Sequence, residues 1–136
     1  MAGYSGTPLP RKLGIKPGAR LATSAAPADF VKTLGKLPAG VKAVELGRSK
    51  GPFDVLVCFF VAEKAFAAAL PKLEKVLEPS GGMWIAWPKK ASKVATDMTE
   101  DVVRKHALPR GLVDNKVCAI DETWSGLRLV VRLENR

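Results

Sequence analysis

The longest apolar stretch of the chain predicts a strand that is buried on both faces. Residues 53–61 read Phe-Asp-Val-Leu-Val-Cys-Phe-Phe-Val and are almost all aromatic, aliphatic or β-branched. Such a run is typical of a central strand in a parallel sheet, because helices cover both faces of that sheet. We therefore place residues 53–61 inside the sheet.

Segments with helical and strand patterns alternate around this strand. Residues 63–78 carry one apolar stripe at helical spacing, so we expect a helix that Pro71 kinks or divides. A second helix is expected over residues 99–108, with Thr99 as its N-cap. The remaining expected elements are strands over residues 19–24, 41–46, 83–87, 116–121 and 127–133, and short helices over residues 9–13 and 27–35.

Strands separated by helices predict an α/β fold. They imply parallel βαβ units with right-handed crossovers, and residues 122–126 predict the turn of a C-terminal antiparallel hairpin. We expect a three-layer α/β domain of about six mostly parallel strands. Residues 1–136 should form a single domain, with residues 1–18 as an irregular, turn-rich arm and residues 19–136 as the core.

The polar and apolar patterns also indicate where in the cell the protein is located. No apolar run reaches the roughly 18 residues of a membrane-spanning helix, and the first ten residues lack the apolar segment of a signal peptide. Two cysteines, Cys58 and Cys118, lie far apart in apolar runs and are expected to be buried and inert. We therefore expect a cytoplasmic protein.

Positive charge is concentrated in the first third of the chain. The sequence carries 22 Lys and Arg against 13 Asp and Glu, a net charge of +9. Residues 1–50 hold nine basic and two acidic side chains, whereas residues 51–136 hold thirteen and eleven. An anionic partner would contact the first fifty residues, although a solubilising surface explains the same charge. Nucleic acid is a weaker candidate, because only Tyr4 and Phe30 provide aromatic rings in that segment.

Polar side chains follow several expected strands and predict a ligand pocket. Ligands of parallel α/β sheets bind beyond the carboxyl ends of the strands. Lysines there would bind phosphate, an acid would hold a polar group and Trp124 would stack on the ligand. The alternative is a structural network in which a lysine pairs with an acid to pin the hairpin and Trp124 covers the core. The candidate ligand-binding residues are Thr23, Ser24, Lys89, Lys90, Thr96, Asp121, Glu122 and Trp124.

Catalytic and metal-binding patterns were not found in the sequence. His106 is the only histidine, and no second His or Cys lies at a ligand spacing from it. The chain has no Ser-His-Asp order, no P-loop and no HExxH. We predict neither catalytic residues nor a metal site.

The order of elements resembles the class I methyltransferase-like Rossmann fold. The resemblance rests on Leu-Gly-Ile-Lys-Pro-Gly-Ala-Arg-Leu at residues 13–21, on Phe-Asp-Val-Leu-Val at residues 53–57 and on Pro-Ser-Gly-Gly-Met-Trp-Ile at residues 79–85. That family has a glycine-rich turn after its first strand, whereas residues 22–27 here contain no glycine. Glu45 is the only candidate for the acid that closes the second strand.

The stretch from residue 46 to residue 53 is too short for a helix and a strand, so one βα unit of that fold should be missing. The resemblance therefore implies a reduced relative. S-adenosylmethionine or a nucleotide is a possible cofactor, although no glycine-rich motif supports either.

A second resemblance covers nearly the whole chain. Trp-Pro-Lys-Lys-Ala-Ser at residues 87–92, Thr-Glu-Asp-Val-Val-Arg at residues 99–104 and residues 111–129, with Gly-Tyr-Ser-Gly-Thr-Pro-Leu at residues 3–9, are similar to a small bacterial family, a domain of unknown function. This resemblance implies a bacterial cytoplasmic protein and supplies no activity. We interpret the chain as a noncatalytic Rossmann-like module that binds an anionic ligand or a protein partner. The alternative is a small transferase-like enzyme that retains a cofactor pocket without the glycine-rich turn.

Overall fold

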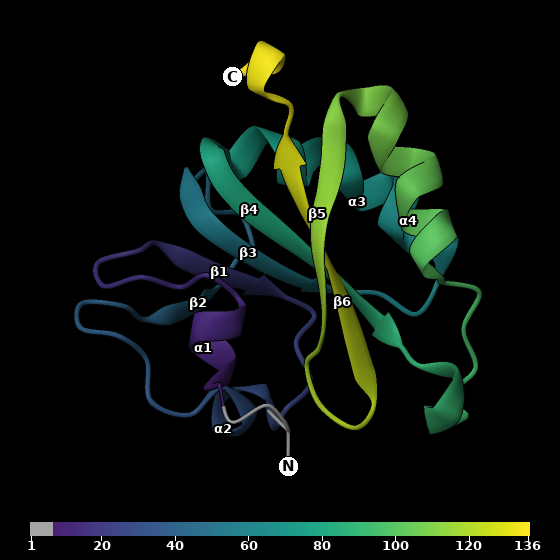
Figure 1. Ribbon diagram of the computed structural model, residues 1–136, viewed down its shortest axis with the longest axis horizontal. Coiled ribbons are helices and arrows are strands. Elements are labelled where there is room, and N and C mark those ends of the chain that lie inside the picture. Colours follow the sequence, from purple (N-terminus) through teal and green to yellow (C-terminus); the bar gives the residue numbers. More distant parts are fainter. Residues whose placement is uncertain (1–6) are drawn as a thin grey trace.

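A six-stranded mixed sheet in the order β2-β1-β3-β4-β6-β5 organises the chain (Figure 1). The computed structural model describes residues 7–136. Strands β2, β1, β3 and β4 are parallel, and the β5–β6 hairpin adds to β4 through antiparallel β6, as the sequence predicts. The strands are β1 Leu21–Ser24, β2 Ala43–Glu45, β3 Phe53–Phe59, β4 Leu77–Pro88, β5 Leu112–Ala119 and β6 Trp124–Val131.

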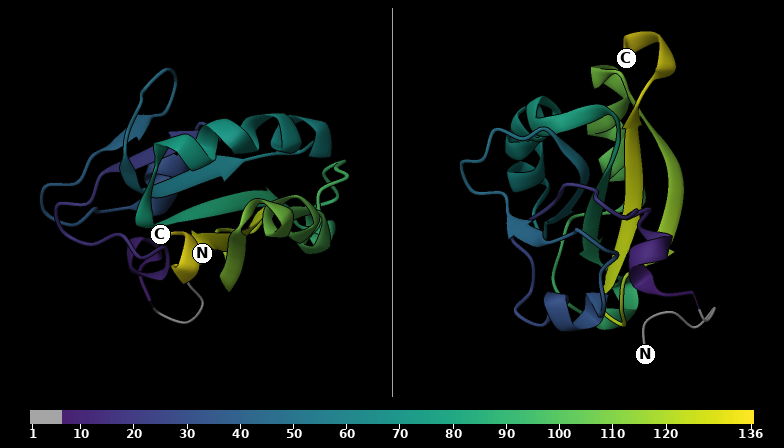
Figure 2. Two further views of the ribbon diagram at one scale, coloured as in Figure 1. Left: turned by 90° about the horizontal axis from the view of Figure 1, so that it is seen from above. Right: turned by 90° about the vertical axis from the view of Figure 1, so that its left-hand side faces the viewer.

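Helices cover both faces of the sheet and give the expected three layers (Figure 2). Helices α1 (Leu9–Lys12) and α2 (Phe30–Leu34) pack on one face, and α3 (Glu63–Val76) and α4 (Glu100–Ala107) pack on the other. Thr99 caps α4, since its hydroxyl accepts a hydrogen bond from the Val102 N–H at 3.1 Å. The expected helical turn near residue 9 is confirmed as α1, while residues 1–6 of the predicted arm lie outside the described residues.

The two sides of β4 belong to different cores. Trp84 is fully buried against the α1 and α2 side, whereas Trp87 is buried against the α3 and α4 side. Side chains three residues apart on a strand point to opposite faces, as expected for these two. Strand β4 therefore holds both layers of helices in place.

Several boundaries differ from the sequence prediction. Pro71 does not divide α3, because apolar residues on both sides of it, including Leu70 and Leu73, are buried against the sheet. The helix ends at Val76 and β4 begins at once at Leu77, which pairs with β3. The segment 79–82, which precedes the strand expected over residues 83–87, is therefore part of β4.

The hairpin turn also comes earlier than expected. Strand β5 ends at Ala119, and the Asp121 carboxylate accepts hydrogen bonds from the N–H groups of Thr123 and Trp124, both at 2.8 Å. An aspartate that binds backbone N–H groups two and three residues ahead fixes a tight turn. The predicted turn over residues 122–126 is therefore shifted towards the N-terminus, and β6 begins at Trp124.

One βα unit is missing, as the chain length between strands predicts. Residues 46–52 connect β2 directly to β3 without a helix. Among the described residues, β2 pairs only with β1, so β2 forms one edge of the sheet. No helix in the described part of the chain is both long and apolar enough to cross a bilayer.

Candidate functional site

The predicted pocket residues around the hairpin lie close together, but they bind one another. The Lys89 ammonium donates a hydrogen bond to the Asp121 carbonyl oxygen at 2.7 Å, and the Lys89 N–H donates to the Thr123 carbonyl oxygen at 2.8 Å. The Asp121 carboxylate holds the turn. This arrangement resembles the structural network that is the alternative to a ligand pocket, in which a lysine pairs with an acid to pin the hairpin. Here, however, Lys89 binds the backbone oxygen of Asp121 rather than its carboxylate. Lys90 and Glu122 are exposed beside it.

The other predicted residues lie apart from this contact. Thr23 is 7% exposed within β1, and Ser24 ends that strand. Thr96 lies before α4, where its hydroxyl donates to the Val61 carbonyl oxygen at 2.5 Å and accepts from the Met98 N–H at 3.0 Å. Thr96 thus joins the α4 loop to the end of β3. Ligand binding by this set of residues stays a prediction.

Three aromatic rings meet at the carboxyl end of β3. Phe59 is the last residue of β3 and packs edge-on against Phe30 of α2, with ring centroids 5.0 Å apart, and against Trp124 of β6, at 5.1 Å. Phe30 and Phe59 are 2% and 3% exposed, and Trp124 is half-buried. The rings therefore occupy the space beside the end of β3 on the α2 side, and Trp124 covers this core.

The turn after β1 has an unusual backbone. Ala25 adopts a left-handed conformation with φ of 55°, which glycine tolerates and alanine rarely adopts. No residue from 22 to 29 is glycine. Glu45, the other cofactor-related candidate, is exposed at the end of β2, and its charge adds to burial in raising the pKa of Cys58 to about 12.

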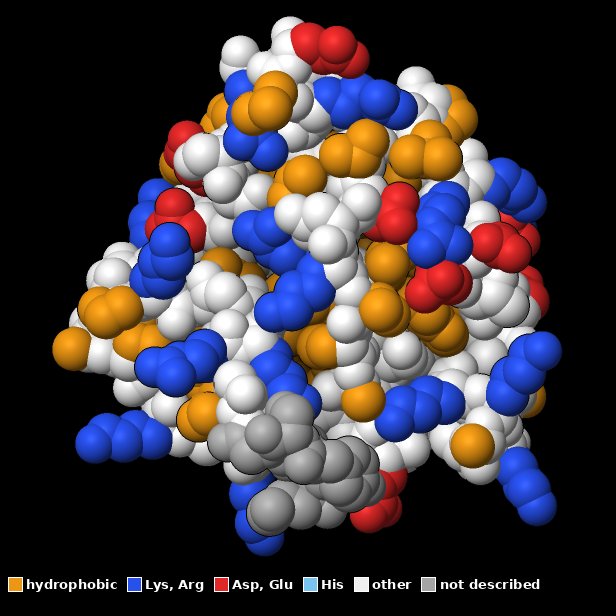
Figure 3. Space-filling view, in the orientation of Figure 1, with side chains coloured by type: hydrophobic (Ala, Val, Ile, Leu, Met, Phe, Trp, Pro, Cys, Tyr) orange, Lys and Arg blue, Asp and Glu red, His pale blue; other side chains and the backbone are white. Residues whose placement is uncertain are grey.

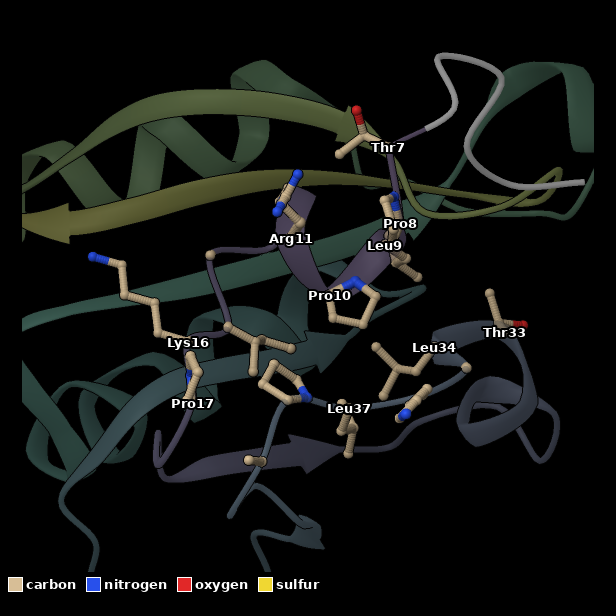
Figure 4. Close-up of a pocket in the computed structure, with 16 residues that line it drawn as sticks. Thr7, Pro8, Leu9, Pro10, Arg11, Lys16, Pro17, Thr33, Leu34 and Leu37 are labelled. Carbon is tan, nitrogen blue, oxygen red and sulfur yellow. The ribbon is translucent and has the colours of Figure 1, made fainter.

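A large groove opens on the α1 side of the molecule. We call it the α1 groove; it has a volume of about 1260 Å³ and is lined by residues 7–11, 14–17 and 33–39. In Figure 4, Pro10 of α1 faces Leu34 and Leu37 across this groove. Leu34 is buried, as are Leu9 and Ile15, so the floor is apolar.

The charged side chains described on the rim of the α1 groove are basic. Arg11, Lys16 and Lys36 line it, and none of the other described lining residues is acidic or a histidine. All three are exposed, and within residues 7–136 none of them forms an ion pair. Figure 3 shows basic side chains gathered down the middle of the face that carries α1. The groove therefore combines an apolar floor with unpaired positive charge.

Long-range hydrogen bonds hold α1 in place as one wall of the groove. The Trp84 indole N–H donates to the Leu13 carbonyl oxygen at 3.0 Å, and the Lys116 ammonium donates to the Lys12 carbonyl oxygen at 3.0 Å. Carbonyls at the end of a short helix lack partners within that helix, so these donors satisfy them. The central sheet therefore fixes the position of the groove.

The only histidine belongs to a network that joins α3 to α4. The Glu63 carboxylate lies 2.6 Å from the Lys105 ammonium and 2.7 Å from His106 Nε2, and hydrogen bonds from Lys105 and then His106 lower the pKa of Glu63. The Asp97 carboxylate accepts from the Glu63 N–H at 2.7 Å. The described residues contain no group of three or more His, Cys, Asp or Glu side chains that could hold a metal ion.

Sequence reasoning missed the α1 groove as a site. Its three basic residues follow no motif, and its walls come from two segments that only the fold brings together. One signal pointed towards it: the excess positive charge of residues 1–50 contains all three cations.

Comparisons with known proteins support the fold. No family model and no curated protein sequence matches this chain. Among solved structures, it is similar to a SAM-dependent methyltransferase from Aquifex aeolicus, with 16% identity, a TM-score of 0.61, and coverage of 89% of this chain and 87% of that one. It is also similar to a putative type 11 methyltransferase from Sulfolobus solfataricus, with 13% identity, a TM-score of 0.62, and coverage of 90% and 89%.

A third similar structure contains a ligand. It is the magnesium protoporphyrin IX methyltransferase from Synechocystis PCC 6803 with bound SAM, with 14% identity, a TM-score of 0.56, and coverage of 85% of this chain and 71% of that one. At such low identity the likeness concerns the fold alone. This chain has the class I methyltransferase-like Rossmann fold, with β2 connected directly to β3.

Proposed function

We propose that this protein is a noncatalytic, methyltransferase-like module that binds a small anionic molecule with an apolar body in the α1 groove. The observation that carries the proposal is a buried apolar floor beside three cations that form no ion pair within residues 7–136, with no acid among the described lining residues. An apolar body gains about 25 cal/mol for each Å² removed from water, and the basic rim favours a negative head group. A neutral or cationic molecule would not use the rim.

The region beyond the parallel strands supports a noncatalytic role. Phe59 packs against both Phe30 and Trp124 at the end of β3. Lys89 and Asp121 hold the hairpin turn, and His106 is bound to Glu63 between two helices. These polar groups bind one another or the backbone, which supports a structural role for them.

One observation favours the alternative, a small transferase-like enzyme with a methyl-donor pocket. Ala25 keeps a left-handed backbone at the turn after β1 although it carries a Cβ. Strained backbone of this kind concentrates at functional sites, and the similar structure from Synechocystis contains SAM. This alternative predicts that S-adenosylhomocysteine binds near the turn after β1.

A pair of ligands with one chain length and opposite charge tests the proposal. Decanoate and decylammonium, both below their micelle concentrations, are titrated into the protein by calorimetry, with S-adenosylhomocysteine as a third ligand. We expect decanoate to bind, decylammonium not to bind, and S-adenosylhomocysteine not to bind. Raising NaCl from about 50 to about 300 mM should weaken the binding of decanoate, because the rim charges are exposed.

Substitutions locate the binding. The double variant Arg11→Gln with Lys36→Gln should lower decanoate affinity about tenfold, corresponding to about 1.4 kcal/mol. Lys64→Gln with Lys75→Gln is the matched control, since it also removes two charges and both lysines are exposed on α3 on the other side of the sheet. Equal binding of both decyl ligands would contradict the proposal. Binding of S-adenosylhomocysteine would favour the enzyme.

A further inference from the structure

A second, smaller cavity adjoins the α1 groove near the amino ends of β1 and β3. It has a volume of about 310 Å³ and shares Gly14, Lys16 and Pro17 with the groove. Its polar lining includes Lys16, Ser80 and Arg128. A ligand in the groove could therefore extend a polar group into this cavity.

Arg128 reaches the cavity from β6 by lying across the β4 backbone. A Cβ atom on Gly82 would lie 2.3 Å from Arg128 Nε and 2.5 Å from Arg128 Nη2. No real Cβ makes contacts this short, so only glycine at position 82 leaves room for this placement of the guanidinium. The glycine is thus required for the side-chain position of Arg128.

The guanidinium of Arg128 has no anionic partner within residues 7–136. None of the ion pairs or side-chain hydrogen bonds formed there includes it. The side chain is half-buried, and this burial, followed by the nearby charge of Arg136, lowers the pKa of Arg128. A partly buried cation without a counter-charge loses hydration that the protein does not replace.

Among the described residues, one acidic side chain, Asp54, lines this cavity. Asp54 accepts a hydrogen bond from the Arg20 N–H at 2.8 Å and forms no ion pair with Arg128. Ser80 is exposed and contributes a hydroxyl group, and Lys16 contributes an ammonium group. The cavity thus offers two cationic groups and a hydroxyl as donors, and with the Asp54 carboxylate its described lining has a net charge of +1.

We propose that Arg128, Lys16 and Ser80 form a subsite for the phosphate group of a phosphomonoester whose apolar body lies in the α1 groove. The position of the apolar body rests on the proposed function, whereas the phosphate subsite does not depend on it. A guanidinium presents parallel N–H donors that match two oxygens of a phosphate, and an ammonium adds a point charge. A carboxylate, with two oxygens and one charge, uses this set of donors less fully.

The test compares decyl phosphate with decanoate, which share the apolar body and differ in the head group. Calorimetric titration of the wild type should show decyl phosphate binding at least about tenfold more tightly than decanoate. Arg128→Gln should remove that advantage and change decanoate affinity less than about twofold. Arg132→Gln, which removes the same charge from a residue outside the cavity, should preserve it.

The outcomes separate the two proposals. If Arg128→Gln lowers the affinities for decyl phosphate and decanoate equally, or lowers neither, the subsite is overturned while the proposal for the groove stands. If neither decyl ligand binds the wild type, the proposed function fails. The subsite is then tested by titration with inorganic phosphate. In that case phosphate should shift the amide signals of Gly81 and Gly82 in the wild type but not in Arg128→Gln. Unchanged signals in the wild type would refute the subsite.

Discussion

Replacing Trp84 with phenylalanine tests how the sheet holds the α1 groove. Trp84 is fully buried on β4, and its indole N–H donates to the Leu13 carbonyl oxygen at 3.0 Å. Phenylalanine keeps an aromatic ring in the core but has no donor. The Leu13 carbonyl, at the end of α1, then loses its partner from the sheet.

The expected loss has two parts. A buried carbonyl left without its donor costs about 1–3 kcal/mol. The smaller ring also leaves about 40 Å³ unfilled, which costs roughly 1 kcal/mol at about 24 cal/mol per Å³. The free energy of unfolding should therefore fall by about 2–4 kcal/mol, a large share of the usual 5–15 kcal/mol of a small domain.

Trp87→Phe provides the matched control. Trp87 lies on the same strand, is 7% exposed on the opposite side, and makes no side-chain hydrogen bond to the described residues. Equilibrium unfolding in urea should show that Trp84→Phe is less stable than Trp87→Phe by about 1–3 kcal/mol. The Trp84 variant should also bind decanoate more weakly. Equal losses of stability would refute the role of the indole hydrogen bond.

Three further predictions concern other parts of the molecule. A hydrogen bond from Lys105, followed in size by one from His106, lowers the pKa of Glu63 below its ordinary value of 4.5. The ionised carboxylate therefore stabilises the fold above pH 4.5, and this stabilisation is lost as the pH falls through the lowered pKa. Urea unfolding should therefore show Glu63→Gln less stable than wild type near neutral pH, with a difference that narrows in acid. Cys58, whose pKa burial raises to about 12, should resist iodoacetamide in the native protein and react once urea unfolds it, as followed by mass spectrometry. Ala25→Gly should raise the free energy of unfolding in urea by about 1 kcal/mol, because glycine relieves the left-handed strain. A variant that is less stable than the wild type would show that Ala25 is unstrained.

Elements determined by local chemistry could be predicted from the sequence. The strand at residues 53–61 follows from an apolar, β-branched run, and β3 occupies Phe53–Phe59 in the interior of the sheet. The cap of α4 follows from a hydroxyl at Thr99. The missing βα unit follows from chain length alone, because seven residues cannot form a helix and a strand.

Features that depend on packing between distant segments could not be predicted. The strand expected over residues 83–87 leaves out Gly81 and Gly82, yet both lie within β4, where a Cβ on Gly81 would approach the Asp54 carbonyl oxygen to 2.5 Å. These glycines permit close approach of neighbouring groups. The α1 groove depends on the contact between Trp84 and Leu13, which are 71 residues apart. No local pattern reports such a contact.

Because residues 46–52 connect β2 directly to β3, β2 forms an open edge of the sheet. An exposed edge offers unpaired N–H and C=O groups to which a strand of another molecule could add. Here β2 spans only Ala43–Glu45, and Lys42 directly precedes it. So short a strand offers few hydrogen bonds to a second molecule, and the adjacent positive charge repels another copy of this chain. The β2 edge of the sheet therefore offers little surface for pairing with a second molecule.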